Sequence, residues 1–172
     1  YMEMKARDNN VKIRFGNPSG AVYSAIADKK RIRQVLINLI DNAIKYSPDG
    51  GTVKVKGRYD DSSVTIYVSD HGVGLSKEDQ DRVFERFYRV DKSRSRDSGG
   101  TGLGLAIVKH IAQAHGGEAT VTSELGEGSA FTIAVPDEVR RGTESDLLDL
   151  EVVTVRPRWL CGTMAFHPML GF

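Results

Sequence analysis

The sequence predicts an α/β fold, a two-layer α/β sandwich in which helices cover one face of a mixed sheet. Apolar residues recur with the 3.6-residue period of a helix in some segments and alternate with polar residues, as in half-buried strands, in others. The two kinds of segment are mixed along the chain, which is typical of this architecture. At 172 residues, 40% of them hydrophobic, the chain is long enough for one such domain with a core.

The first predicted elements are a strand at residues 11–15 and a long helix at residues 29–46. Apolar and charged residues alternate in the strand. Asp28 is predicted to be the N-cap of the helix, and Pro48 ends it because proline disfavours helical backbone in the preceding residue. The helix has one apolar stripe, formed by Ile32, Val35, Leu36, Leu39, Ile40, Ala43 and Ile44.

A hairpin and a second helix are predicted next. Alternating residues at 53–59 and 64–68 indicate the two strands of the hairpin. Ser76 and Asp79 resemble a capping box, whose side chains bond backbone N–H groups at the start of a helix. This helix is expected to carry the apolar side chains of Val83, Phe84 and Phe87.

A mobile loop and a third helix follow. Residues 89–102 are polar, basic and rich in glycine, which predicts a loop. The helix after it is expected to end at Gly116 and Gly117, because glycine commonly terminates helices. One face of this helix consists of Leu103, Ile107, Ile111 and Ala114.

Two more alternating segments, residues 119–123 and 130–135, predict strands joined by a glycine turn. We therefore expect one domain at residues 1–136 and an extension of unknown role at residues 137–172. The extension contains no lysine and shows no clear periodicity, apart from a possible strand at residues 152–155.

The composition argues against several kinds of protein. Its 24 basic and 23 acidic residues give a net charge of +1, so no overall field favours nucleic acid or lipid. No stretch approaches the roughly 20 apolar residues of a membrane span, and the first residues lack the apolar centre of a signal peptide. Cys161 is the only cysteine, which fits a reducing compartment. We expect a cytoplasmic location.

The glycine-rich stretch GGTGLG at residues 99–104 indicates phosphate binding. A helix that starts among glycines presents bare backbone N–H groups at the positive end of its dipole, where anions bind. A flexible linker is the alternative. The stretch lacks the lysine of a P-loop, does not directly follow a strand as a dinucleotide fingerprint does, and is not accompanied by VAIK, HRD and DFG segments.

The sequence DHGVG at residues 70–74 directly follows a predicted strand. The Asp70 carboxylate could accept a hydrogen bond from an exocyclic amine such as that of adenine. Gly72 and Gly74 would let the backbone approach a flat ring. An ordinary turn is the alternative.

Asn38, Asn42 and Lys45 form a polar stripe on the long helix, away from its apolar stripe. Asparagine is a poor helix former, so two in mid-helix suggest a function. The side-chain oxygen of Asn42 could complete the shell of a Mg²⁺ ion that keeps waters and phosphate oxygens, and Lys45 would add positive charge. A solvated helix face is the alternative.

Four segments together resemble a known family. NLIDNAIKYS, DHGVG, FERFYR and GGTGLGL, which start at residues 38, 70, 84 and 99, resemble the N, G1, F and G2 boxes of the sensor histidine kinase ATP-binding domain. That domain belongs to the superfamily of heat-shock chaperone, gyrase and mismatch-repair ATPases. The resemblance covers about residues 11–136 and implies a Bergerat-type ATP-binding fold with ATP and Mg²⁺ as cofactors.

The resemblance implies roles for individual residues. Asn42 matches the metal-binding asparagine, Asn38 a supporting position near the phosphates, Lys45 a phosphate contact and Tyr46 a residue of the nucleotide pocket. Asn38, Asn42 and Lys45 are the candidate catalytic residues. Asp70 matches the aspartate that reads adenine. The other nucleotide contacts that it implies are Gly72, Gly74, Arg89, Gly100, Thr101, Gly102, Leu103 and Gly104.

Basic residues are frequent in and beside residues 89–102, which match the family's ATP lid. They could bind the γ-phosphate or only increase the solubility of the protein, and the sequence does not identify one of them as catalytic. The residues concerned are Arg86, Arg89, Lys92, Arg94 and Arg96.

Asn38 distinguishes activities within the family. Relatives that hydrolyse ATP or phosphorylate serine typically have a glutamate there as general base, and an amide cannot take a proton at neutral pH. A neutral imidazole needs no base, because its ring nitrogen has a lone pair that attacks phosphorus directly. We therefore expect transfer of the γ-phosphoryl group to histidine. A nucleotide-gated binding module without transfer is the alternative.

The acceptor histidine is expected on another segment, because no histidine of this chain lies in the acceptor motif of the family. The expected partners are a histidine-bearing dimerisation or phosphotransfer domain, of the same kinase or a separate protein, and a response regulator downstream. No nucleic acid and no membrane contact are expected for this segment. The four histidines are His71, His110, His115 and His167.

Overall fold

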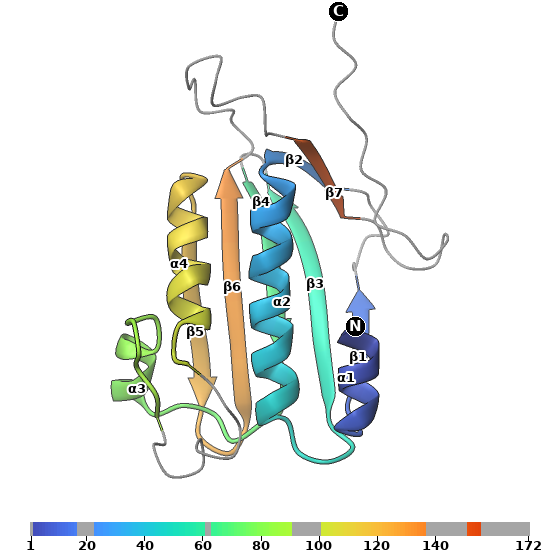
Figure 1. Ribbon diagram of the computed structural model, residues 1–172, viewed down its shortest axis with the longest axis vertical. Helices are drawn as coiled ribbons and strands as arrows, with labels where there is room; N and C mark the ends of the chain where they lie inside the picture. Colours follow the sequence, from blue (N-terminus) through green and yellow to red (C-terminus); the bar gives the residue numbers. More distant parts are fainter. Residues whose placement is uncertain (1, 17–22, 61–62, 91–100, 137–150, 156–172) are drawn as a thin grey trace, which may run out of the picture.

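The computed structural model describes residues 2–16, 23–60, 63–90, 101–136 and 151–155. Its elements are α1 (Met2–Asp8), β1 (Lys12–Gly16), β2 (Tyr23–Ala27), α2 (Lys29–Tyr46), β3 (Thr52–Asp60), β4 (Ser63–Ser69), α3 (Lys77–Arg82), α4 (Gly104–Ala114), β5 (Glu118–Glu124), β6 (Gly128–Pro136) and β7 (Glu151–Val155). Five strands form a mixed sheet in the order β1-β3-β4-β6-β5, with β1 and β3 parallel and the other neighbours antiparallel. Figure 1 shows α2 and α4 side by side on one face, which confirms the predicted sandwich.

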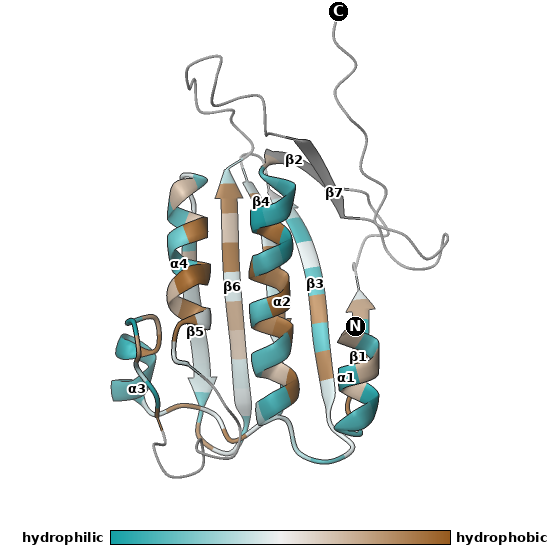
Figure 2. Ribbon diagram, in the orientation of Figure 1, coloured by the Kyte–Doolittle hydropathy of each residue, from teal (hydrophilic) through white to brown (hydrophobic). Residues whose placement is uncertain are grey.

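The core lies between this sheet and the two helices. The Asp28 side chain accepts a hydrogen bond from the N–H of Arg31 at 2.9 Å, so the predicted N-cap of α2 is confirmed. Val35 and Leu39 are fully buried. Figure 2 shows hydrophobic and hydrophilic residues alternating along α2, as expected for a helix with one buried face. From the sheet, Val53 and Ile133 point into the same core. Periodicity therefore identified the buried face of α2 correctly. On α4, of the predicted face only Ile111 is buried, together with Val108 and Ala112, and Ala114 is exposed.

The second predicted helix is shorter than expected. α3 ends at Arg82, and the apolar residues assigned to it follow the helix instead. Phe84 packs edge-on against Phe131, with ring centroids 6.2 Å apart. Phe87 has a left-handed backbone with φ of 65° and is 70% exposed. The prediction for Phe87 was wrong because the chain leaves helical geometry after Arg82, where the partly buried Phe84 packs against the core.

Two elements were absent from the sequence prediction. α1 has only seven residues, and it packs through the buried Ala6 and an ion pair between Lys5 and Asp41 of α2. β2 pairs antiparallel with β7, which confirms the strand expected at residues 152–155. The partner of β2 lies far along the chain, so the local pattern alone gave no signal for it. Among the described residues, no helix has the length and apolar content needed to cross a bilayer.

His115 joins the end of α4 to the start of α2. Its Nε2 accepts a hydrogen bond from the N–H of Asp28 at 3.0 Å, and its Nδ1 lies 2.8 Å from the carbonyl oxygen of Ile111. These partners require a neutral ring with the proton on Nδ1. His115 is therefore a structural residue.

His115→Ala is expected to lower the free energy of unfolding by about 1–3 kcal/mol, because it leaves the N–H of Asp28 without its acceptor. Urea denaturation measures the loss. His110→Ala, on the exposed side of the same helix, is the matched control and should change stability by less than about 0.5 kcal/mol. Equal losses in the two variants would contradict the assignment.

Candidate functional site

Three predicted site segments lie at one end of the sandwich, the lower end in Figure 1: the C-terminal end of α2, the loop after β4 and the start of α4. The Nδ2 of Asn38 donates a hydrogen bond to the carbonyl oxygen of Gly104 at 3.2 Å. A Cβ atom on Gly72 would lie 2.2 Å from the carbonyl oxygen of Tyr46. Asn42 lies one turn after Asn38 and one turn before Tyr46, so it sits on α2 between these two contacts.

Asp70 is the buried acidic group of this end. It is 7% exposed and follows β4 directly. Its N–H donates to the carbonyl oxygen of Ser129 at 2.9 Å, and its Oδ1 accepts the N–H of Gly72 at 2.8 Å. The backbone of Ser129 also interacts favourably with the charged carboxylate. A carboxylate has about four lone-pair sites, so Asp70 keeps the capacity to accept a further hydrogen bond from a ligand.

Burial raises the pKa of Asp70 above its ordinary value, although the bonds to Gly72 and Ser129 and the proximity of His71 act in the opposite direction. Between the ordinary and the raised pKa the folded state binds more protons than the unfolded state. The contribution of Asp70 to stability therefore increases as the pH falls through this window. At neutral pH the buried charge is destabilising.

Asp70→Asn is expected to remove this pH dependence. The stability of the unaltered protein relative to the variant should rise as the pH falls from 7 through the raised pKa of Asp70 toward about 4. Urea denaturation of both proteins across this range measures the difference. A difference that is constant, or that falls on acidification, would contradict the raised pKa.

The glycines after Asp70 are required by close backbone contacts. The Cβ of any other residue at position 72 would collide with Tyr46, as described above. Gly74 has φ of +68°, and a Cβ there would lie 2.0 Å from the carbonyl oxygen of Glu124. The loop is thus packed between the end of α2 and the turn that joins β5 to β6.

The start of α4 offers backbone donors. No side chain caps the helix at Leu103, and the N–H of Ile107 is bonded to the carbonyl oxygen of Leu103 at 2.9 Å. The N–H groups of the first turn therefore have no partner within the helix, and the helix dipole makes this end positive. The oxygen of Thr101 accepts a long bond of 3.4 Å from the N–H of Leu103. This end can hold an anion.

The structure modifies one detail of the glycine prediction. Gly102, with φ of +71°, precedes α4, and only Gly104 belongs to its first turn. The glycines therefore shape the approach to the helix rather than the whole of its first turn. Gly100 lies outside the described residues, as do Lys92, Arg94, Arg96 and His167.

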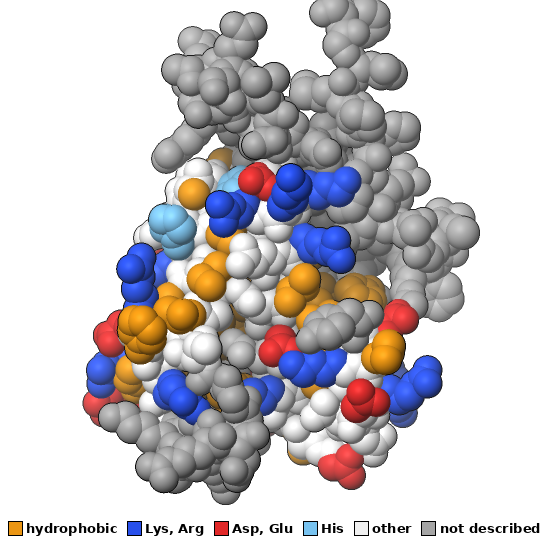
Figure 3. Space-filling model, in the orientation of Figure 1, with side chains coloured by type: hydrophobic (Ala, Val, Ile, Leu, Met, Phe, Trp, Pro, Cys, Tyr) orange, Lys and Arg blue, Asp and Glu red, His pale blue; other side chains and the backbone are white. Residues whose placement is uncertain are grey.

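The remaining predicted residues of α2 lie at its last turns. Asn42 and Lys45 are half-buried, and the Nζ of Lys45 lies 5.1 Å from the centroid of the Tyr46 ring. Tyr46 is 51% exposed, and Arg89 is half-buried. Four cations, Lys29, Lys30, Arg31 and Arg33, occupy the opposite end of α2, where basic side chains gather in Figure 3. They lie too far along the helix to serve this site.

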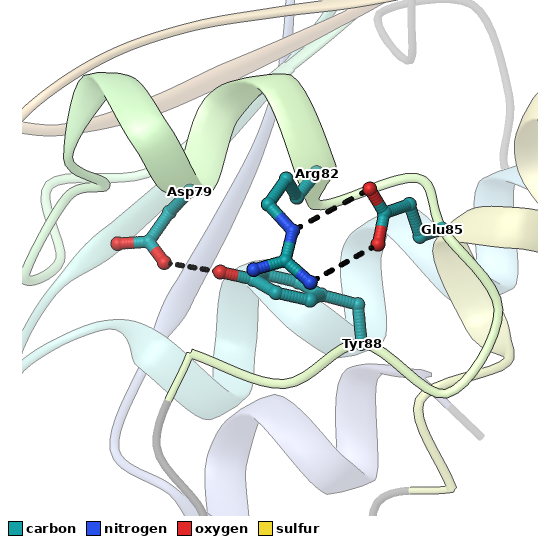
Figure 4. Close-up of polar contacts among 4 residues, drawn as sticks. All are labelled: Asp79, Arg82, Glu85 and Tyr88. Carbon is teal, nitrogen blue, oxygen red and sulfur yellow. Dashed lines mark hydrogen bonds and ion pairs between the residues drawn. The ribbon is translucent and has the colours of Figure 1, made fainter.

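Side chains from α3 onward form a cluster that the sequence analysis missed (Figure 4). The Tyr88 hydroxyl donates to Oδ1 of Asp79 at 2.7 Å, Arg82 lies over the Tyr88 ring at 4.4 Å, and Arg82 pairs with Glu85 at 3.4 Å. Hydrogen bonds from Ser76 and Tyr88 lower the pKa of Asp79, while the bond to Asp79 raises the pKa of Tyr88. The three-residue spacing of opposite charges was the available signal.

A residue beside this cluster contacts the segment before α4. Phe87 lies directly before Tyr88, and its N–H donates to the carbonyl oxygen of Gly102 at 3.0 Å. A Cβ on Gly102 would lie 2.8 Å from the carbonyl carbon of Phe87. The segment after α3 is therefore in van der Waals contact with the segment that presents the backbone donors. Among the described residues, no cluster of three or more His, Cys, Asp or Glu side chains could hold a metal.

Comparison with known proteins gives a consistent result. The sequence profile of the "Histidine kinase-, DNA gyrase B-, and HSP90-like ATPase" family matches residues 27–139. The sensor-like histidine kinase SenX3 of Mycolicibacterium smegmatis is 43% identical over 144 residues, which are 84% of this chain and 37% of that protein. The chain thus spans little more than a third of the length of this relative.

Solved structures share the fold. Full-length ShkA in complex with AMPPNP matches with a TM-score of 0.68 and 31% identity, over 82% of this chain and 28% of ShkA. The histidine kinase ThkA in complex with the response regulator protein TrrA matches with a TM-score of 0.65 and 26% identity, over 80% of this chain and 37% of that one.

Proposed function

Because the chain belongs to the family of histidine kinase-, DNA gyrase B- and HSP90-like ATPases, we propose that it is the ATP-binding catalytic domain of a sensor histidine kinase. One observation carries the proposal. A buried carboxylate, two glycines in close contact with their neighbours and a helix start whose N–H groups have no partner within the helix lie at the same end of one sandwich. Relatives named as sensor histidine kinases support the assignment.

The described residues fit an adenine nucleotide. The Asp70 carboxylate would accept a hydrogen bond from the exocyclic amine of adenine, and Gly72 and Gly74 would let the loop pack closely enough to hold the carboxylate in place. The N–H groups at the start of α4, with Gly102 and Gly104 before and within the first turn, would bind the phosphates. The match to ShkA in complex with AMPPNP, an ATP analogue, supports this placement.

Asn42 would hold Mg²⁺ through its amide oxygen, with waters and phosphate oxygens as the other ligands. When bound, the ion would neutralise charge on the phosphates and orient them for in-line transfer. Lys45, one turn along from Asn42, would add a positive charge on the same side of α2.

The proposed reaction transfers the γ-phosphoryl group of ATP to a histidine nitrogen. Asn38 uses its amide to hold the carbonyl of Gly104, so at this position the chain has a structural donor and no base. A neutral imidazole attacks without a base, which makes histidine the fitting acceptor. His115 has both ring nitrogens engaged in structural contacts, and none of the four histidines lies in the acceptor motif of the family, so the proposed acceptor belongs to a separate helical domain. A response regulator would then receive the group, and a cytoplasmic location is proposed with it.

The test uses the full chain with a histidine-bearing dimerisation domain of a sensor kinase as acceptor. Titration calorimetry with AMPPNP and Mg²⁺ is expected to show one site, and γ-labelled ATP is expected to label the acceptor with an acid-labile phosphoryl group. The chain alone should hydrolyse ATP slowly and remain unlabelled. Binding without any transfer to histidine would instead favour a nucleotide-gated binding module, and absence of binding would exclude both functions.

A further inference from the structure

The loop that carries Asp70 is held from one side by the hairpin of β5 and β6. The N–H of Leu75, at the far end of this loop, donates to the Oγ of Ser123 at 2.8 Å. In the middle, the carbonyl oxygen of Val73 accepts the N–H of Gly126 at 2.9 Å. With the bond from Asp70 to Ser129, the loop is fastened to the hairpin at its start, middle and end. Only the last of these three fastenings depends on a side chain, that of Ser123.

The Ser123 hydroxyl uses its whole hydrogen-bonding capacity. It accepts from Leu75, donates to the carbonyl oxygen of Gly128 at 2.7 Å and lies 2.9 Å from the Oγ of Ser129, which can donate to it. A hydroxyl has one hydrogen and two lone pairs, so these three partners satisfy it completely. Gly128 in turn is packed against Asp70, since a Cβ on Gly128 would lie 2.2 Å from the Asp70 carbonyl oxygen. The hydroxyl thus contacts the far end of the Asp70 loop directly and its start through Gly128.

Gln80 of α3 supports the same junction. β5 is an edge strand, so one side of its backbone has no neighbouring strand in the sheet. The Gln80 amide accepts the N–H of Ser123 at 3.3 Å and donates to its carbonyl oxygen at 3.0 Å, which replaces the missing strand at this residue. The same Nε2 also lies 3.1 Å from the carbonyl oxygen of Leu75. Gln80 therefore ties α3, β5 and the Asp70 loop together.

We propose that Ser123, supported by Gln80, is a positioning residue that sets the Asp70 carboxylate for recognition of the adenine base. The proposal rests on the proposed function, because it assigns the orientation of the group that reads the base. Neither side chain contacts Asp70 directly, so both act through the loop. The expected effect is on the choice of base and not on the binding of phosphates, which the start of α4 performs.

The test compares ADP with IDP, whose base has a carbonyl oxygen where adenine has its amine. Titration calorimetry on the full chain gives the ratio of the two dissociation constants, which measures discrimination by Asp70. In Ser123→Ala this ratio is expected to fall by about 3- to 10-fold, through weaker ADP binding, while IDP affinity changes by less than about 2-fold. Gln80→Leu should lower the ratio by about 2- to 5-fold and provides a second variant should Ser123→Ala fold poorly.

Two controls separate positioning from general loss of structure. Ser129→Ala removes a hydroxyl that, among the described residues, bonds to Ser123 and not to the loop, and it should keep the ratio. Ser123→Thr retains the oxygen and should restore the ratio. Urea denaturation of each variant records stability independently, because a purely structural role would lower stability and leave discrimination unchanged.

The outcomes distinguish the two proposals. Strong preference for ADP in the unaltered protein, with the same preference in Ser123→Ala and Gln80→Leu, would overturn the positioning role and leave the proposed function standing. No binding of either nucleotide by the unaltered protein would overturn both. A lowered ratio in both variants, retained in Ser129→Ala, would support the positioning role.

Discussion

Asp70→Asn is expected to weaken adenine nucleotide binding by roughly 10- to 100-fold, because a hydrogen bond to a buried carboxylate contributes about 1.5–3 kcal/mol. Asparagine has the same shape and keeps a carbonyl oxygen for the N–H of Gly72. Its NH₂ group would face the amine of adenine, and two hydrogen-bond donors cannot bond to each other. Titration calorimetry with ADP measures the change, and the circular dichroism spectrum should stay the same.

Asp49→Asn provides the matched control, since Asp49 is an exposed carboxylate that bonds only to the side chain of Asn10 among the described residues. Its nucleotide affinity should equal that of the unaltered protein. The base reader would have to be sought elsewhere if both variants bound ADP equally well.

Asn42→Ala is expected to slow phosphoryl transfer to the acceptor by about 100-fold or more, because the protein ligand of the proposed magnesium site is lost and metal-ion catalysis contributes several kcal/mol. The rate of acceptor labelling with saturating ATP and Mg²⁺ measures it. Binding of ADP in the presence of EDTA should be nearly unchanged, since the Asp70 loop is untouched.

The control for this change is Gln34→Ala, which removes a half-buried amide two turns earlier on α2. It should leave the rate of transfer and the magnesium dependence intact. Equal rates in Asn42→Ala and the unaltered protein would remove Asn42 from the metal site.

The sequence predicted those parts of the fold and site that depend on local pattern. α2 begins after its predicted cap and ends at Tyr46 as expected, because capping, periodicity and Pro48 all act within one segment. Asp70 could be selected because a carboxylate and two glycines directly follow a strand. The convergence of Asn42, Asp70 and Gly102 at one end depended on the resemblance to a family, since no local rule gives it.

What the sequence did not predict depends on contacts between distant residues. The left-handed backbone of Phe87 follows from the packing of Phe84 on Phe131 and the bond to Gly102, which lie far along the chain. The roles of Gln80 and Ser123 could not be seen either, because an amide on a short helix and a serine in a strand are ordinary residues. Their partners become visible only when α3 is placed beside the edge of the sheet.

The pairing of β2 with β7 affects how a shorter version of this protein should be made. The family profile ends at residue 139 and the last strand of the sandwich ends at Pro136, so both limits suggest ending a shorter version there. That truncation would also remove β7, the strand that pairs with β2. The backbone groups of an unpaired strand readily form hydrogen bonds with another molecule. A chain truncated there is expected to aggregate more readily than the 172-residue chain, and expression trials for crystallography should therefore retain the polypeptide through Val155.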